Sequence, residues 1–229
     1  MSISNVIPSI KICGLRDAAT IQAMNGLAIT EVGLVFAPSK RQVSASLGSE
    51  LVKAIQSIEG RDQKSPKAAG VFVNYPLKDM LKLLERVPLD IVQLHGQEKV
   101  DYYAALHKQL DDAVLWKVVS IDASRQLLEV SQIIEELKPF MAYVDRLLID
   151  APGGGTGKPF NWNAIAAYRA AAQHFEKPLV IAGGLHAGNV TDLLQQHRVD
   201  GIDVSSGVET NGIKDIVKIK EFVGKVIEA

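Results

Sequence analysis

The run DRLLID at residues 145–150 decides the fold class of this 229-residue chain, because three apolar residues follow one another there without a polar residue between them. A strand with one face in water alternates apolar and polar residues, whereas a strand in a parallel sheet is covered on both faces and is apolar along its length. The run VFV at 71–73 has the same form. Both runs therefore predict parallel strands that are buried on both faces.

Six further strand-like runs, besides these two, are spread along the chain, which makes eight in all. The eight runs together lie at 9–15, 30–36, 68–73, 90–95, 114–120, 145–150, 178–183 and 201–205. The segments between them carry apolar residues three and four positions apart, as in an amphipathic helix; examples are Leu77, Met80, Leu81 and Leu84, and Ile216, Ile219, Phe222 and Val223. Alternating strands and helices predict parallel pairing, and eight such units predict an α/β protein with a (β/α)8 TIM barrel, as a single domain over residues 1–229. Periodicity alone leaves a doubly wound open sheet as the alternative.

Composition narrows the class of protein. The net charge of −1 offers no basic surface for nucleic acid or for membranes, so neither is expected as a partner. A single cysteine, Cys13, excludes an internal disulfide and favours the reducing cytoplasm. No signal peptide is recognised at the N-terminus, and no apolar stretch approaches the roughly 20 residues that span a bilayer. Residues 59–66 and 151–159 are interpreted as loops within one domain.

Glycine and serine residues follow the seventh and eighth predicted strands. Gly183 and Gly184 come after one, and Ser205, Ser206 and Gly207 after the other. Barrels often bind phosphate at these two loops through backbone N–H groups. Two tight turns would explain either group alone, but their occurrence at neighbouring strands favours a phosphate site. The loops after the third and fourth strands have no equivalent, which predicts one phosphate on the ligand.

Cys13 and Asp150 end the first and sixth predicted strands, at the end of a barrel where catalytic groups lie. A lone cysteine is often only a small buried side chain, and an aspartate after a strand is often only a turn residue. A thiolate can act as a base if a positive charge lies nearby, and a buried carboxyl group can act as an acid. An acid and a base on opposite sides of the barrel mouth are what an isomerase needs.

Two further side chains are candidates for the same end of the barrel. Arg41, after the second strand, is either a solvated surface group or a two-pronged partner for a carboxylate. His95 ends the fourth strand and is interpreted as a core or rim histidine. Because no cluster of His, Asp or Glu occurs at the strand ends, no metal or other cofactor is expected.

Several segments together resemble the phosphoribosylanthranilate isomerase family, and they follow the family's order from the first strand to the last. The matching pieces are KICGL (11–15), GLVF (33–36) with Arg41, QLHG (93–96), LID (148–150) with GGTG (154–157), FNW (160–162), AGGL (182–185), DVSSGVE (203–209) and GIKD (212–215). Any one piece is weak, but DVSSGVE together with KICG is specific. Arg16 departs from the family pattern, which commonly has a small hydroxyl residue at this place.

The resemblance implies an Amadori rearrangement of N-(5-phosphoribosyl)anthranilate to 1-(2-carboxyphenylamino)-1-deoxyribulose 5-phosphate in tryptophan biosynthesis, without cofactor or metal. It implies that Asp150 is the general acid that protonates the ring oxygen and that Cys13 is the general base that takes the C2′ proton. Arg41 would hold the anthranilate carboxylate. The phosphate would bind at Gly183, Gly184, Ser205, Ser206 and Gly207, and Asp203 and His95 complete the expected substrate-binding residues.

Other functions compete with this interpretation. Indole-glycerol-phosphate synthase would need a lysine-rich mouth and an N-terminal extension, and a pentose-phosphate epimerase would need metal-binding histidines at strand ends. A non-catalytic barrel that binds a phosphorylated ligand would keep the glycine loops but lose Cys13 or Asp150, and both are present. The barrel fold alone would not decide among these.

Overall fold

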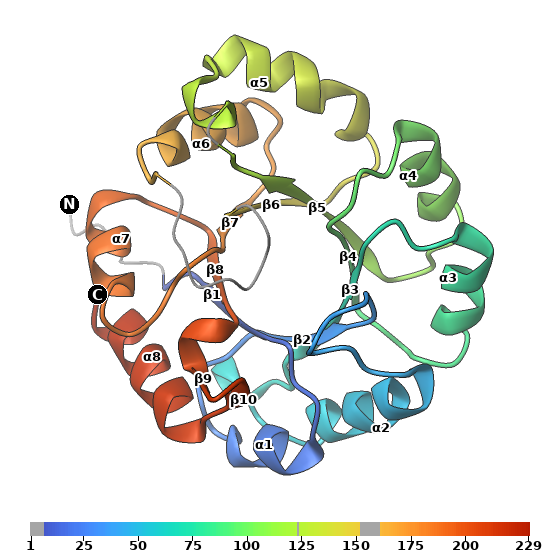
Figure 1. Cartoon of the computed structure of the whole chain (residues 1–229), viewed down its shortest axis with the longest axis vertical. Coiled ribbons are helices and arrows are strands. Elements are labelled where there is room, and N and C mark those ends of the chain that lie inside the picture. Colours follow the sequence, from blue (N-terminus) through green and yellow to red (C-terminus); the bar gives the residue numbers. More distant parts are fainter. Residues whose placement is uncertain (1–6, 123, 152–160) are drawn as a thin grey trace.

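Eight parallel strands close into a barrel in the computed structural model, which describes residues 7–122, 124–151 and 161–229 (Figure 1). The barrel strands are β1 (Ser9–Cys13), β2 (Glu31–Val35), β3 (Lys67–Phe72), β4 (Ile91–Leu94), β5 (Val114–Ser120), β6 (Arg146–Asp150), β7 (Leu179–Ile181) and β8 (Gly201–Val204). Strand β1 pairs in parallel with both β2 and β8, so the sheet has no open edge. This closure confirms the barrel and excludes the doubly wound alternative.

Helices follow the strands and form the outer layer, as Figure 1 shows. They are α1 (Ala18–Ala23), α2 (Ala45–Gln56), α3 (Leu77–Leu84), α4 (Val100–His107), α5 (Val130–Leu137), α6 (Ala164–His174), α7 (Val190–Gln196) and α8 (Ile216–Glu228). Side-chain caps fix where some of them begin; the Asp215 carboxylate, for example, accepts hydrogen bonds from the backbone N–H groups of Val217 and Lys218 at the start of α8. None of the helices in the described ranges is long and apolar enough to cross a membrane.

All eight predicted strands are present, with ends that differ from the predicted ones by at most two residues. Several short elements were not predicted, among them 3-10 turns at Arg61–Gln63, Arg125–Leu127 and Lys138–Phe140. Between β8 and α8 the chain forms a short 3-10 turn (Ser206–Val208) and then an antiparallel hairpin of β9 (Glu209–Thr210) and β10 (Ile213–Lys214). Strands of two residues are too short to show any periodicity, so sequence patterning could not detect them. The GGTG segment and Phe160 of the resemblance lie outside the described residues.

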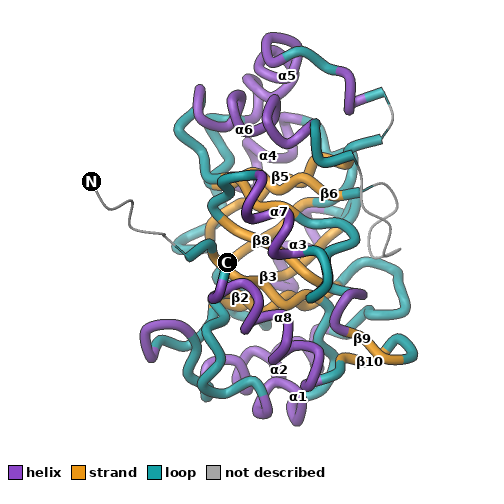
Figure 2. The backbone as a smooth tube through the Cα atoms, turned by 90° about the vertical axis from the view of Figure 1, so that its left-hand side faces the viewer, coloured by secondary structure: helices purple, strands orange, loops and turns teal. Residues whose placement is uncertain are grey.

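Alternation along the strands divides the buried side chains into two cores. One lies inside the barrel and consists of Ala69, Ile91, Trp116, Val118, Leu148, Val180 and Ala182. The other lies between the strands and the helices and includes Ile10, Ile12, Leu147 and Ile149. Figure 2 shows the strands enclosed between helices on both sides. Since successive side chains alternate, the inward positions of β1 are Lys11 and Cys13 and that of β6 after Leu148 is Asp150. The fold therefore aims these polar groups into the barrel mouth.

Candidate active site

A cavity of about 410 Å³ opens at the carboxyl ends of the barrel strands. This is where barrels hold their active sites, and the volume suits a small-molecule ligand. Nine of the ten site residues predicted from sequence line it, namely Cys13, Arg41, His95, Asp150, Gly183, Gly184, Asp203, Ser205 and Ser206. The structure thus brings together groups that lie up to 193 positions apart in the chain.

Cys13 lies beside a buried ion pair. The ammonium group of Lys11, two residues earlier on the same face of β1, donates a hydrogen bond to Asp203 Oδ2 at 2.9 Å, and Lys11 is only 1% exposed. Burial alone would lower the pKa of Lys11, but Asp203 and Cys13 raise it above its ordinary value, so this lysine carries a permanent positive charge. Burial also raises the pKa of the Cys13 thiol, and Lys11 and Lys214 act against that rise. The positive charge that a thiolate needs is therefore present, although burial still favours the thiol.

Asp150 is the second titratable group of the cavity. Burial, and after it the nearby charge of Asp203, raises the pKa of Asp150 from 3.8 to about 7. His95 Nε2 lies 3.6 Å from Asp150 Oδ2, which is too long for a strong hydrogen bond. Burial lowers the pKa of His95, so the imidazole is neutral at pH 7 and does not stabilise the carboxylate as an ion pair would. Asp150 can therefore hold a proton near neutral pH, as a general acid must.

Two acceptor atoms in the barrel interior are left without a hydrogen-bond partner among the residues that the structure describes. They are Asp203 Oδ1 and Gln93 Oε1, and both side chains line the cavity. Buried polar atoms normally have partners. The arrangement is suited to a ligand that brings its own donors, such as the hydroxyl groups of a sugar.

The glycine and serine residues after β7 and β8 form one wall of the cavity. Gly183 and Gly184 both have positive φ, at 88° and 66°, in the turn that leaves β7. Gly207 does not line the cavity; a Cβ atom on it would lie 1.8 Å from the Leu185 carbonyl oxygen, so it allows the two loops to approach each other. Ser205 Oγ donates to the Cys13 carbonyl oxygen at 3.0 Å, which fixes this wall to the end of β1.

Arg41 lies at the cavity with 8% of its surface exposed, and it is not a solvated surface group. Its guanidinium already donates two hydrogen bonds to Glu209, from Nε at 2.6 Å and from Nη2 at 2.9 Å. The two-pronged face predicted for a ligand carboxylate is thus turned to a protein carboxylate, and Nη1 is the nitrogen that remains. Arg16, by contrast, is exposed and donates to the Lys40 carbonyl oxygen at 2.7 Å.

Some residues of the site were not identified from sequence as functional. Lys11 lies two positions before Cys13, and Gln93 lies two positions before His95. Because side chains alternate along a strand, each of them shares the inner face with the predicted site residue that follows it. Glu209 and Lys214 were recognised only as letters of the matching segments. Strand alternation could therefore have identified Lys11 and Gln93 from the sequence, whereas no local pattern could have identified Glu209 and Lys214 as neighbours of the site.

The fold and the site together are those of a closed (β/α)8 barrel whose mouth holds a carboxyl group with a pKa of about 7 and, on another strand, a thiol near a buried lysine, which are groups able to exchange protons with a ligand. Comparison with known proteins identifies the family. The family described as N-(5'-phosphoribosyl)anthranilate (PRA) isomerase matches residues 10–225 of the chain.

Individual relatives agree with that match. N-(5'-phosphoribosyl)anthranilate isomerase of Brevibacillus brevis is 38% identical over 221 residues, which cover 95% of this chain and 92% of the relative. The crystal structure of phosphoribosyl anthranilate isomerase from Thermotoga maritima is similar with a TM-score of 0.77 and 28% identity, over 97% of this chain and all of that one. A further structure of such an isomerase, in complex with reduced 1-(o-carboxyphenylamino)-1-deoxyribulose 5-phosphate, has a TM-score of 0.75 and 26% identity, with 97% and 100% covered. The chain belongs to the N-(5'-phosphoribosyl)anthranilate isomerase family.

Proposed function

We propose that this protein converts N-(5'-phosphoribosyl)anthranilate to 1-(2-carboxyphenylamino)-1-deoxyribulose 5-phosphate in tryptophan biosynthesis, with Asp150 as general acid and Cys13 as general base. Membership of the family supports the reaction. The observation that supports the residue roles is the pKa of about 7 at Asp150, in the same cavity as Cys13. The use of one cysteine in 229 residues supports the cytoplasm as the place of action.

The first step needs an acid. A carboxyl group with a pKa of about 7 is protonated in a large share of molecules at neutral pH, whereas an ordinary aspartate is not. Asp150 donates this proton to the ring oxygen, the bond from that oxygen to C1′ breaks, and the nitrogen electron pair forms the C1′–N double bond. The product of this step is an open-chain, protonated Schiff base, and the Asp150 carboxylate lies beside it.

The second step needs a base. The Cys13 thiolate takes the C2′ proton, the electrons of that bond form a C1′–C2′ double bond, and the Schiff-base nitrogen is neutralised. The resulting enol becomes the ketone by moving a proton from the C2′ hydroxyl to C1′, so the whole reaction is an isomerisation without a net change of redox state. Lys11 stays positively charged next to Cys13 and lowers the cost of forming the thiolate.

Two anchors hold the substrate ends. Gly183, Gly184, Ser205 and Ser206 form the proposed phosphate wall, and Gly207 sets the spacing of the two loops. Arg41 lines the same cavity as Cys13 and is the proposed partner of the anthranilate carboxylate. The unpartnered oxygens of Asp203 and Gln93 are the proposed acceptors for sugar hydroxyl groups, and His95 lies next to Asp150.

A fluorescence assay tests the function. The substrate is generated in situ from anthranilate and phosphoribosyl pyrophosphate by a separate transferase, and its disappearance is followed after addition of the protein. The proposal predicts catalysed loss of the substrate signal with formation of the aminoketone. A rate equal to the spontaneous decay of the substrate would reject the function.

A further inference from the structure

The hairpin between β8 and α8 places two charged side chains against the active-site loop after β2. Glu209 and Lys214 are direct partners in the register of β9 and β10, and their side chains are 5% and 4% exposed. Lys214 Nζ donates to Glu209 Oε1 at 2.7 Å and to the Ser205 carbonyl oxygen at 2.8 Å. Neither residue lines the cavity. The hairpin thus delivers a buried ion pair to the back of the cavity wall.

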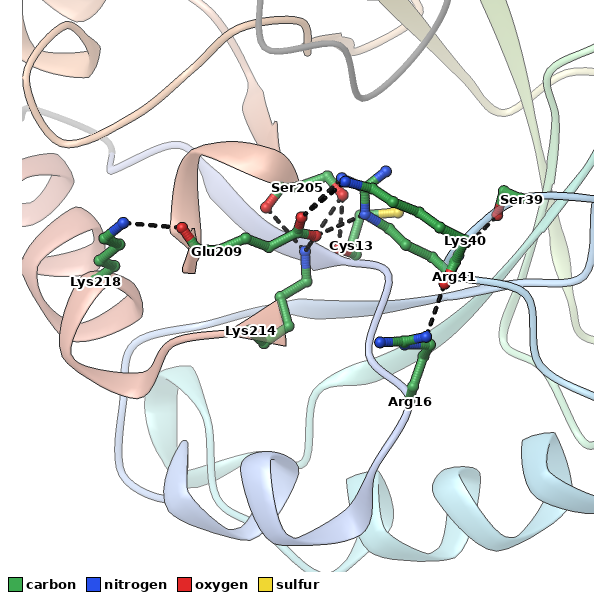
Figure 3. A network of polar contacts seen from close by, with 9 residues as sticks. All are labelled: Cys13, Arg16, Ser39, Lys40, Arg41, Ser205, Glu209, Lys214 and Lys218. Atoms are coloured by element: carbon green, nitrogen blue, oxygen red, sulfur yellow. Dashed lines mark hydrogen bonds and ion pairs between the residues drawn. The ribbon is translucent and has the colours of Figure 1, made fainter. Parts of the chain in front are cut away.

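Glu209 is the centre of this cluster. Its carboxylate accepts two hydrogen bonds from Arg41 and one from Lys214, and Lys40 Nζ lies 3.7 Å away (Figure 3). Although burial alone would raise the pKa of Glu209, the hydrogen bonds from Arg41 and Lys214 lower it to about 2. Lys218 also holds the hairpin at this place, by donating to the Glu209 carbonyl oxygen at 2.8 Å. The carboxylate is therefore ionised at neutral pH, and these hydrogen bonds hold it in place.

Arg41 packs closely over Gly14, where only a residue without a side chain leaves space for it. Its Cδ lies 2.5 Å from the place where a Cβ of Gly14 would be, and Gly14 has a positive φ of 88°. The backbone N–H of Arg41 donates to Ser39 Oγ at 3.1 Å. The guanidinium passes over Gly14 and ends on Glu209, with Nη1 as its remaining donor.

We propose that Glu209 is a positioning residue for ligand recognition: it holds the Arg41 guanidinium so that one nitrogen, and not the two-pronged face, meets the ligand carboxylate. This inference rests on the proposed role of Arg41 in the proposed function. Without Glu209, the positive charges of Arg41 and Lys214 would face each other without a counter-charge in a buried site, and repulsion would turn Arg41 away from its position. Glu209 thus contributes to binding without contacting the ligand.

A double-mutant cycle tests the proposal. Glu209→Gln keeps the shape and removes the charge, and Arg41→Ala removes the group on which Glu209 acts. KM and kcat for the substrate, and the Kd of anthranilate as a simple carboxylate probe, are measured for the wild type, both single variants and the double variant. We expect Glu209→Gln to raise KM and Kd on the order of tenfold, as expected for loss of one charged hydrogen bond, with kcat almost unchanged. In the Arg41→Ala background the same change should have less than about a twofold effect.

Glu31→Gln is the matched control. The Glu31 side chain is similarly buried, at 6% exposed, and lies 3.3 Å from an arginine, Arg146, but at the opposite end of the barrel. This variant should leave KM and Kd unchanged. If Glu209→Gln does not fold, as seen by circular dichroism, Glu209→Asp replaces it; it keeps the charge but shortens the reach, and should raise KM and Kd by a smaller factor in the same background-dependent way.

The outcomes separate the two proposals. An effect of Glu209→Gln that is the same with and without Arg41, or no effect on Kd in the wild-type background, overturns the positioning role even if turnover is normal. A background-dependent effect on anthranilate binding in a protein without isomerase turnover keeps the positioning role and rejects the function. If the wild type neither binds anthranilate nor turns over substrate, both are rejected.

Discussion

Asp150→Asn should make the protein more stable and nearly inactive, and the gain in stability should depend on pH. The folded protein holds the Asp150 proton to a pKa of about 7, whereas the unfolded chain releases it near 3.8. Between these two values the unfolded state binds fewer protons than the folded state, so the free energy of unfolding falls as pH rises. Below pH 3.8 Asp150 is neutral in both states and the penalty is absent. Above pH 7 the penalty is complete.

The magnitude follows from the two pKa values. Each pH unit between them corresponds to about 1.4 kcal/mol, so the wild type carries a penalty of about 4 kcal/mol at pH 8.5 that the asparagine variant lacks. This figure is an upper bound, because the asparagine amide is itself a polar group in a site where only 7% of the residue is exposed. Urea unfolding at pH 4 and pH 8.5 measures the difference. The two proteins should be nearly equal at pH 4, and the variant should be clearly more stable at pH 8.5.

Although Asp150→Asn should be more stable than the wild type, it should be much less active. The amide keeps the shape of the carboxyl group but cannot donate the acid proton, so kcat should fall by about 10²–10⁴, while anthranilate binding persists. A stability difference that is the same at both pH values would refute the reasoning, because it would show that Asp150 has an ordinary pKa in the folded state. Retained kcat would show that another group is the acid.

Three other predictions concern the same cavity. Cys13→Ser should lose at least about 10²-fold in kcat, and iodoacetamide should inactivate the wild type with protection by phosphate; near-normal turnover of the serine variant would return Cys13 to a packing role. Since the active form needs Cys13 ionised and Asp150 protonated, kcat/KM should fall about tenfold per pH unit below pH 7 and stay level above it until the raised pKa of the thiol is reached; a maximum near pH 5 would contradict these assignments. A crystal soaked in sulfate should show the anion at Gly183, Gly184, Ser205 and Ser206, and an anion bound elsewhere with this wall empty would count against the phosphate site.

Local pattern was sufficient for the eight strands because each strand carries its own signal, whereas closure into a barrel depends on the pairing of β1 with β8. Runs such as Leu147-Leu148-Ile149 are apolar on both faces, and strand ends then place Cys13 and Asp150 at the mouth. The ends of β7 shifted most, to Leu179–Ile181, since Ala182 and Gly183 continue the apolar or small-residue pattern after the strand pairing stops.

Contacts between side chains that are far apart in the sequence could not be predicted from local sequence patterns. Arg41 was expected to present its two-pronged face to a ligand, but that face meets Glu209, 168 residues away in sequence. Nothing local to Arg41 or Glu209 indicates the partnership, because it depends on a hairpin with two-residue strands. The raised pKa of Asp150 likewise depends on burial and on Asp203, which only the closed barrel brings near.

The account depends most directly on removal of the C2′ hydrogen. Substrate that carries deuterium at C2′ can be given to the wild type and to Cys13→Ser, and the product analysed by mass spectrometry and NMR. The account predicts that the wild type converts the labelled substrate to the aminoketone at a lower rate than unlabelled substrate, because the C2′–D bond must break, and that Cys13→Ser loses most of this conversion. Conversion of the labelled substrate by Cys13→Ser at the wild-type rate would contradict the account.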